Sequence, residues 1–196
     1  MKWATRALIH FDRVASAWLI FRFVDKSAEF LFLREGEKID SDVIPFALPG
    51  AALASHNGET TTFQRILDAH SIADAGLTRL AALVASVVDH VMKDRDRTCV
   101  VSRDPLVGGV LAVAEGAMLL SATDGECLKR SIPLYDALYA RLTAQLEIER
   151  RAPSPPAAVL EQTLKVARAA DALRRSRTQF SSGSFADALR ADSSTN

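Results

Sequence analysis

One stretch near the N-terminus, residues 3–25 (WATRALIHFDRVASAWLIFRFVD), most restricts how this chain can fold. Its first part, Thr5 to Phe11, is typical of a short buried strand. From Val14 to Val24 apolar residues recur at helical spacing, and further apolar residues make the helix apolar nearly all round. Because such a helix must be covered on more than one side, we expect it at the centre of a domain.

The polar residues in this stretch are gathered at the first turn of the expected helix, where Asp12, Arg13 and Ser16 follow the strand. Asp12 is expected to cap the helix, because its carboxylate can accept the free N–H groups of the first turn. A strand end that meets a helix N-terminus also attracts anions. The residues therefore predict either a ligand site or a plain cap beside a solvated arginine.

Composition limits the class of protein. The chain has 196 residues, 48% of them hydrophobic, which predicts one domain of ordinary size with a large core. Its formal net charge of zero predicts no general attraction to nucleic acid or membranes. No apolar run is expected to approach the roughly 20 residues of a membrane helix. Cys99 and Cys127 form no CxxC pattern, and with no signal peptide evident we expect a reducing, cytoplasmic location.

Strands are expected early in the chain and helices late. Further strands are predicted at residues 29–34 and 43–48, and helices at 62–67, 77–92, 106–120, 124–149 and 159–175. This order predicts an α+β fold, with a small mixed sheet near the N-terminus packed against a larger set of helices. The proline-rich break RRAPSPPAA predicts a domain of residues 1–150, followed by a helical extension with a frayed polar tail over residues 151–196.

Two further groups of residues could carry chemistry. His56 and Glu59 lie three residues apart in a glycine-containing loop, where an imidazole and a carboxylate can converge on a metal ion. We expect this loop and the first turn at Asp12 to face one polar pocket. Near the end of the helix at 77–92, Asp89, His90 and Lys93 form either part of that site or a solvated helix end. The sequence contains no GxSxG, HExxH or GxxxxGK[ST] motif.

The motifs of the first stretch resemble a known family. A W-x-T-R motif precedes DRVASAWLIFRFVD, and AEFLFL, IPF, PG and YDALY follow at the matching places. Over roughly residues 1–145 the chain resembles the C-terminal domain family of the chromate-resistance protein ChrB. The residues that carry the resemblance include Trp3, Thr5, Arg6, Asp12, Arg13, Trp18, Asp25, His56, Gly58 and Phe63.

The resemblance implies a role in chromate resistance, because ChrB-type proteins are chromate-responsive regulators that accompany an efflux pump. Longer members carry an extra N-terminal region to which DNA binding would be assigned. This chain begins at the shared domain, so we expect no binding to nucleic acid by itself. The family pattern has cysteines where this chain has Ser16 and Thr61, so reduction of chromate by those thiols is not available here.

Two functional hypotheses from different classes follow. The first is a domain that binds or senses an oxyanion such as chromate through Asp12, Arg13, Ser16, Thr61 and Lys93. The second is an enzyme that uses a divalent transition metal held by His56, Glu59, Asp89 and His90. A third hypothesis is that the chain is a family member that kept the fold and lost the site. We expect the protein to bind a small oxyanion or a metal and not to bind a membrane. Homo-oligomerisation is left open.

Overall fold

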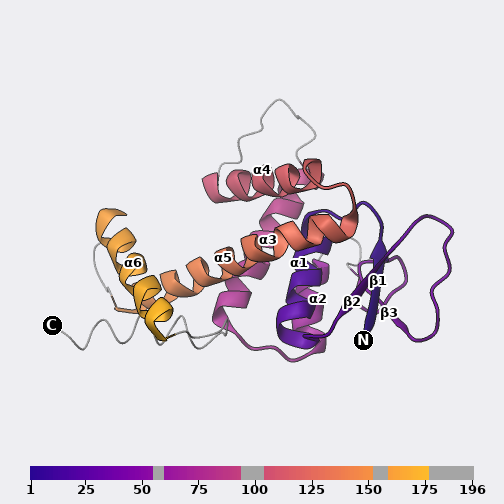
Figure 1. Cartoon of the computed structure of the whole chain (residues 1–196), viewed down its shortest axis with the longest axis horizontal. Helices are drawn as coiled ribbons and strands as arrows, with labels where there is room; N and C mark the ends of the chain where they lie inside the picture. Colours follow the sequence, from indigo (N-terminus) through magenta and orange to yellow (C-terminus); the bar gives the residue numbers. More distant parts are fainter. Residues whose placement is uncertain (55–59, 94–103, 152–158, 177–196) are drawn as a thin grey trace. The chain divides into compact units, whose positions relative to one another are not determined.

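The computed structural model describes residues 1–54, 60–93, 104–151 and 159–176 (Figure 1). Three strands and six α-helices occur in these ranges, with a π-helical segment, η1, directly after the first helix. Their bounds are β1 Lys2–Arg6, α1 Phe11–Leu19, η1 Ile20–Val24, β2 Glu29–Leu33, β3 Val43–Pro45, α2 Thr62–Ala69, α3 Ala75–Lys93, α4 Pro105–Leu119, α5 Asp124–Arg151 and α6 Val159–Ser176.

The chain divides into two compact units, which are described separately. The first comprises Met1–Ala73 and Ala81–Tyr135, and the second comprises Asp74–Leu80 and Asp136–Asn196. Helices α3 and α5 contribute residues to both units. The separation into a domain of residues 1–150 and an extension over 151–196 stays a prediction.

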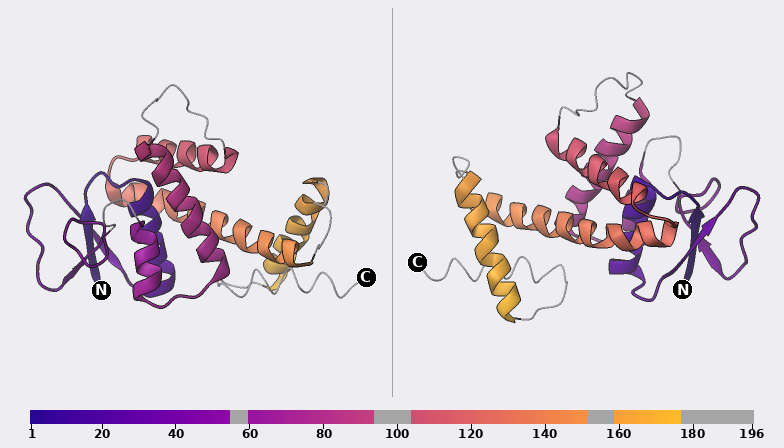
Figure 2. Two further views of the ribbon diagram at one scale, coloured as in Figure 1. Left: turned by 180° about the vertical axis from the view of Figure 1, so that it is seen from behind. Right: turned by 45° about the horizontal axis from the view of Figure 1, so that its top comes forward.

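The sheet of the first unit is parallel. Its strand order is β2-β1-β3, and β1 pairs in parallel with both neighbours, with Arg6 opposite Leu33 and Lys2 opposite Val43. The α+β class is confirmed, but the expected mixed sheet is wrong for the described strands. For β1 and β2 the reason is that α1 lies between them in the sequence and returns the chain in the same direction. Figure 2 shows α1 beside this sheet in both views.

The first strand lies earlier than the sequence indicated, at Lys2–Arg6 instead of Thr5 to Phe11. The strand stops because Leu8 has a φ of 58°, in the left-handed region that side chains rarely adopt. The N–H groups of Leu8 and Ile9 donate to the Asp124 carboxylate at 3.1 and 2.7 Å. Residues 7–10 therefore form a loop that joins the sheet to α1 and is held by hydrogen bonds to Asp124.

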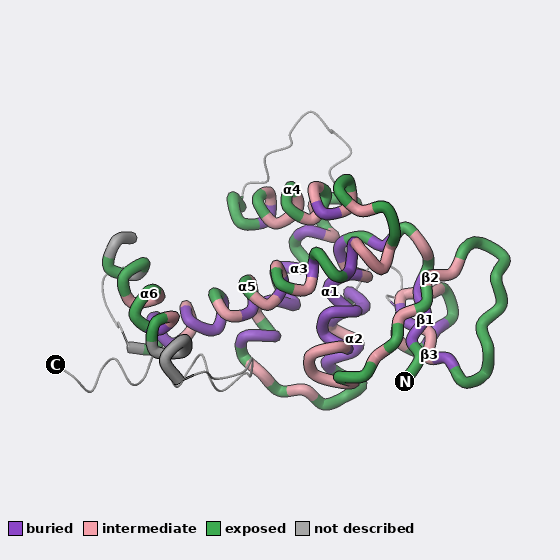
Figure 3. Tube along the Cα trace, in the orientation of Figure 1, coloured by how far each residue is buried: buried purple, intermediate pink, exposed green. Residues whose placement is uncertain are grey.

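Helix α1 is the centre of the first unit, as its apolar composition predicted. All residues from Val14 to Ile20 are buried (Figure 3). Trp18 is 0% exposed, and its ring lies against Phe23, Phe63 and Tyr135 with centroid distances of 5.5, 6.4 and 6.0 Å. The Tyr135 hydroxyl also donates to the carbonyl of Phe11 at 3.2 Å. Aromatic rings from η1, α2 and α5 thus meet around one indole.

Two other helices begin at residues whose side chains cap them. Thr61 precedes α2 and accepts from the N–H of Gln64, and Asp104 precedes α4 and accepts from the N–H of Leu106. Among the described residues, one helix is long and apolar enough to cross a membrane by length and composition, over Ala75–Met92, and 39% of that window is buried. The helix itself was predicted at residues 77–92, but its apolar run was expected to be too short for a membrane helix, because Arg79 and Asp89 interrupt it. A buried core helix passes the same test, so the finding is weak evidence for a membrane span.

The second unit is built around the start of α3 and the later part of α5. Asp74 accepts from the N–H of Leu77 at 2.8 Å and from the Tyr139 hydroxyl at 3.0 Å, which joins the helix cap to α5. Arg79 and Glu149 form a surface ion pair between the same two helices. These contacts fix the first turn of α3 against α5.

Gly76 in that first turn allows the close approach. A Cβ at this position would lie 2.3 Å from Thr143 Oγ1 and 2.9 Å from a Tyr139 ring carbon. We expect Gly76→Ala to lower the free energy of unfolding by about 1–3 kcal/mol, as overpacking does. The matched control is Gly109→Ala in α4, where nothing lies within 4 Å of the added Cβ. This control should be neutral or stabilising by up to about 1 kcal/mol. Urea unfolding of both variants provides the measurement, and equal effects would contradict the expectation.

Candidate functional site

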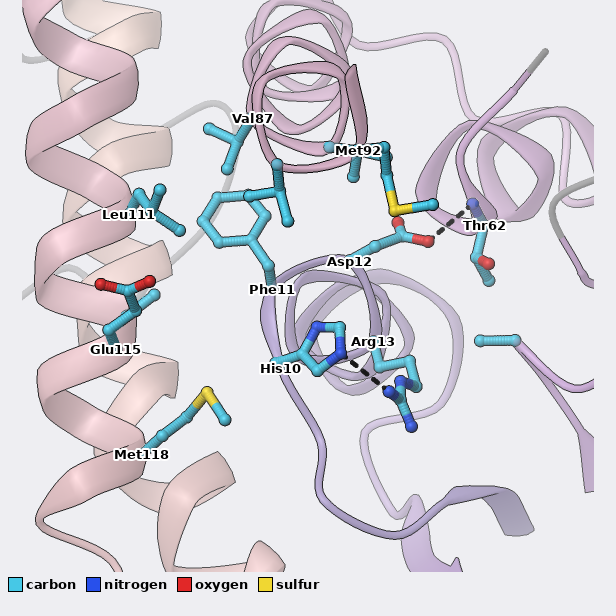
Figure 4. Close-up of a pocket in the computed structure, with 14 residues that line it drawn as sticks. His10, Phe11, Asp12, Arg13, Thr62, Val87, Met92, Leu111, Glu115 and Met118 are labelled. Carbon is cyan, nitrogen blue, oxygen red and sulfur yellow. Dashed lines mark hydrogen bonds between the residues drawn. The ribbon is translucent and has the colours of Figure 1, made fainter. Parts of the chain in front are cut away.

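The first turns of α1 and α2 meet through Asp12. Its carboxylate oxygens accept from the backbone N–H groups of Thr62 and Phe63 at 3.1 and 3.3 Å (Figure 4). The expectation that Asp12 caps its own helix is therefore wrong. The N-cap of α1 is His10, without a side-chain cap bond, and Asp12 turns toward the helix that begins 50 residues later.

Acceptors from within the protein satisfy the backbone N–H groups at the N-terminus of α2. Asp12 accepts from the first two amides, and Thr61 Oγ1 accepts from the third, that of Gln64, at 3.2 Å. Burial raises the pKa of Asp12, while the two backbone donors act in the opposite direction. Ser16 and Thr61 are buried and line neither of the two cavities described below. The first turn of α2 therefore presents no open donors to an external oxyanion.

Arg13 holds the loop between β1 and α1. Its Nη1 donates to the carbonyls of Arg6 and Ala7 at 3.0 and 3.3 Å, and its Nη2 lies 3.0 Å from His10 Nε2. Partial burial and the charge of Arg13 lower the pKa of His10, so the imidazole is neutral and accepts this bond. Burial and then the charge of Arg6 lower the pKa of Arg13 itself.

A cavity of about 740 Å³ lies at the carboxyl ends of β1 and β2. Arg6, the last residue of β1, and Arg34, the first residue after β2, both line it. Their side chains are exposed and, within the described part of the chain, pair with no carboxylate. Glu35 and Asp124 also line the cavity, but both oxygens of Asp124 accept backbone N–H groups of the loop. The carboxyl ends of parallel strands are a common position for ligand sites.

The start of α5 also lines this cavity. Thr123 Oγ1 accepts from the N–H of Glu126 at 3.1 Å, and the Glu126 carboxylate accepts from the N–H of Ala122 at 2.9 Å. This reciprocal arrangement resembles a capping box and fixes where the helix begins. The positive end of the α5 dipole therefore faces the same space as Arg6 and Arg34.

The expected metal site is only partly described. His56 and Glu59 lie outside the described residues, as does the side chain of Lys93. Asp89 and His90 occupy the C-terminal part of α3, and each takes part in at least one interaction. Among the residues that the structure describes, no three His, Cys, Asp or Glu side chains could hold a metal ion together. The metal hypothesis stays a prediction.

The sequence interpretation missed Arg6 and Arg34 as site residues. They are 28 positions apart, and only the parallel pairing of β1 with β2 brings them to one edge. The signal that could have found them is a basic residue at the end of each of two neighbouring strands. Arg6 was noted only as part of the W-x-T-R motif.

The fold and this cavity define a small α+β domain with arginines at the carboxyl edge of a parallel sheet. The chain belongs to the ChrB C-terminal domain family of chromate-resistance proteins, whose model matches residues 3–142. It is also 33% identical over 144 residues to Protein ChrB of Cupriavidus metallidurans (strain CH34), which covers 73% of this chain. The chain spans 41% of that relative's length. No solved structure matches it.

Proposed function

We propose that this domain binds a tetrahedral oxyanion such as chromate in the cavity at the carboxyl ends of β1 and β2. The observation that carries the proposal is the pair Arg6 and Arg34, which both line this cavity without a carboxylate partner among the described residues. Membership of the chromate-resistance family makes chromate the first oxyanion to test.

The two arginines of the lining favour an anion, and Glu35 and Asp124 in the same lining balance their formal charge. Guanidinium groups bind oxyanions through two parallel N–H···O bonds, which are stronger than neutral hydrogen bonds. The N-terminus of α5 adds the positive end of its dipole to this lining. Arg13 itself is bonded to the loop carbonyls, so we give it a positioning role for the backbone of Arg6.

Changes at the two arginines test this proposal. We expect Arg6→Gln and Arg34→Gln each to weaken chromate binding about tenfold, because each removes a charge-assisted interaction worth about 1.5–3 kcal/mol. Titration calorimetry with chromate, and with sulfate as a second tetrahedral dianion, gives the affinities. The matched control is Lys26→Gln, which removes an exposed charge from the turn before β2.

The control variant should bind chromate with the affinity of the unchanged protein. Added salt should weaken chromate binding by both proteins. Chromate affinity that is equal in the arginine variants and the unchanged protein would contradict the proposed site. Failure of the unchanged protein to bind chromate or sulfate at millimolar concentration would contradict the proposed function.

A further inference from the structure

A second cavity, of about 420 Å³, lies between the first turn of α1, the C-terminal part of α3 and α4 (Figure 4). Its volume is in the range of small-molecule sites, about 300–1,000 Å³. Most of its lining is apolar, and the principal side chains are Phe11, Val87, Val91, Leu111 and Met118. All of these residues belong to the first unit.

The polar groups of this cavity favour a cation over an anion. Asp12 and Glu115 provide two carboxylates, and Arg13 provides one positive charge that is bonded to loop carbonyls. His10 is neutral beside Arg13. The charges that line the cavity therefore sum to about minus one, and an oxyanion would meet repulsion here.

Glu115 is exposed and provides the cavity with a carboxylate at its solvent side. It is the only charged residue in α4, an otherwise apolar helix, and it lies between Leu111 and Met118 on the cavity wall (Figure 4). Within the described part of the chain, no hydrogen bond or ion pair engages its carboxylate. Asp12 accepts two N–H groups and retains acceptor capacity, since an ionised carboxylate offers about four lone-pair sites.

We propose that this cavity binds a small organic cation, with an apolar body against α3 and α4 and its ammonium group at the Glu115 carboxylate. The site is separate from the arginine-lined cavity and does not depend on the oxyanion proposal. Three probes of equal chain length test it: hexylammonium, 1-hexanol and hexyl sulfate.

The methionines of the chain give a direct readout. There are three, of which Met92 and Met118 line this cavity, whereas Met1 is exposed in the chain before β1 and lines neither cavity. With ¹³C-methyl-labelled methionine, hexylammonium should shift the Met92 and Met118 signals and leave that of Met1 in place. Met118 also lines the arginine-lined cavity, but Met92 does not, so a shift of Met92 identifies this site.

We expect hexylammonium to bind up to about fivefold more tightly than hexyl sulfate, since an exposed carboxylate contributes up to about 1 kcal/mol. Glu115→Gln should remove most of this preference and leave hexanol binding unchanged. Ala114→Phe should block all three probes by filling the cavity, whereas Ala112→Phe, on an exposed position of the same helix, should not.

Several results would overturn the proposal. They are an unshifted Met92 at millimolar hexylammonium, tighter binding of hexyl sulfate, or equal effects of the two phenylalanine variants. Shifts of Met92 that depend on protein concentration without a probe would show that a second copy of the chain occupies the cavity instead. If Ala114→Phe does not fold, Glu115→Gln still decides the question, because it changes charge without changing size.

Discussion

Replacing Trp18 with alanine should lower the free energy of unfolding by about 3–5 kcal/mol, the usual loss for a fully buried large aromatic residue. Trp18 is 0% exposed and lies at the meeting point of aromatic rings from η1, α2 and α5. Removing the indole leaves a cavity bordered by Phe23, Phe63 and Tyr135. These rings belong to three separate elements, so they cannot collapse into the space together.

Urea unfolding followed by circular dichroism measures this loss, because the signal does not require the deleted tryptophan. Trp18→Phe keeps an aromatic ring and should cost less than the alanine variant. Leu119→Ala serves as a surface control, since Leu119 is 87% exposed, and should change stability by less than about 0.5 kcal/mol. A loss below about 1 kcal/mol for Trp18→Ala would show that α1 is not the centre of the unit.

The second large effect is expected at Asp12. Asp12→Ala should destabilise the protein by about 2–4 kcal/mol, because it removes the acceptor of two amides at the start of α2 and leaves part-buried donors unpaired. Asp12→Asn keeps the size of the side chain but offers one oxygen instead of two. We therefore expect an intermediate loss for the asparagine variant.

Thr61→Ala is the matched comparison, since it removes one cap bond of the same helix, to Gln64, and should cost about 1 kcal/mol. Thermal and urea unfolding of the three variants give the order of the losses. If Asp12→Ala cost no more than Thr61→Ala, the contact between the two helices would not contribute to stability. Under conditions in which Asp12→Ala remains folded, it should still bind the oxyanion, because Asp12 does not line the arginine-lined cavity.

The apolar spacing from Val14 identified α1, and helices close to the observed α2 and α4 were predicted over residues 62–67 and 106–120. Features set by distant partners were not predicted. The apolar residues after Arg6 appeared to continue the first strand, but Leu8 and Ile9 bond to Asp124, more than 110 positions away. No local pattern contains that information.

The same distinction explains the candidate site. Asp12 and Arg13 were singled out because polar residues interrupt an apolar stretch, and the structure places both at the junction of β1 and α1. Their partners were not predictable, since Asp12 bonds to amides 50 and 51 residues later. Arg6 and Arg34 meet only through the register of β1 with β2. Sequence spacing does not reveal which strands are neighbours.

The contact from Asp12 to α2 also has a consequence for the order in which the helices form. Helix α2 has eight residues, too few to be stable as an isolated peptide in water. Two of its first donors find their acceptor only when α1 is in place. The two helices should therefore open as one cooperative unit, and the amide protons of Thr62 and Phe63 should exchange with solvent only when α1 detaches.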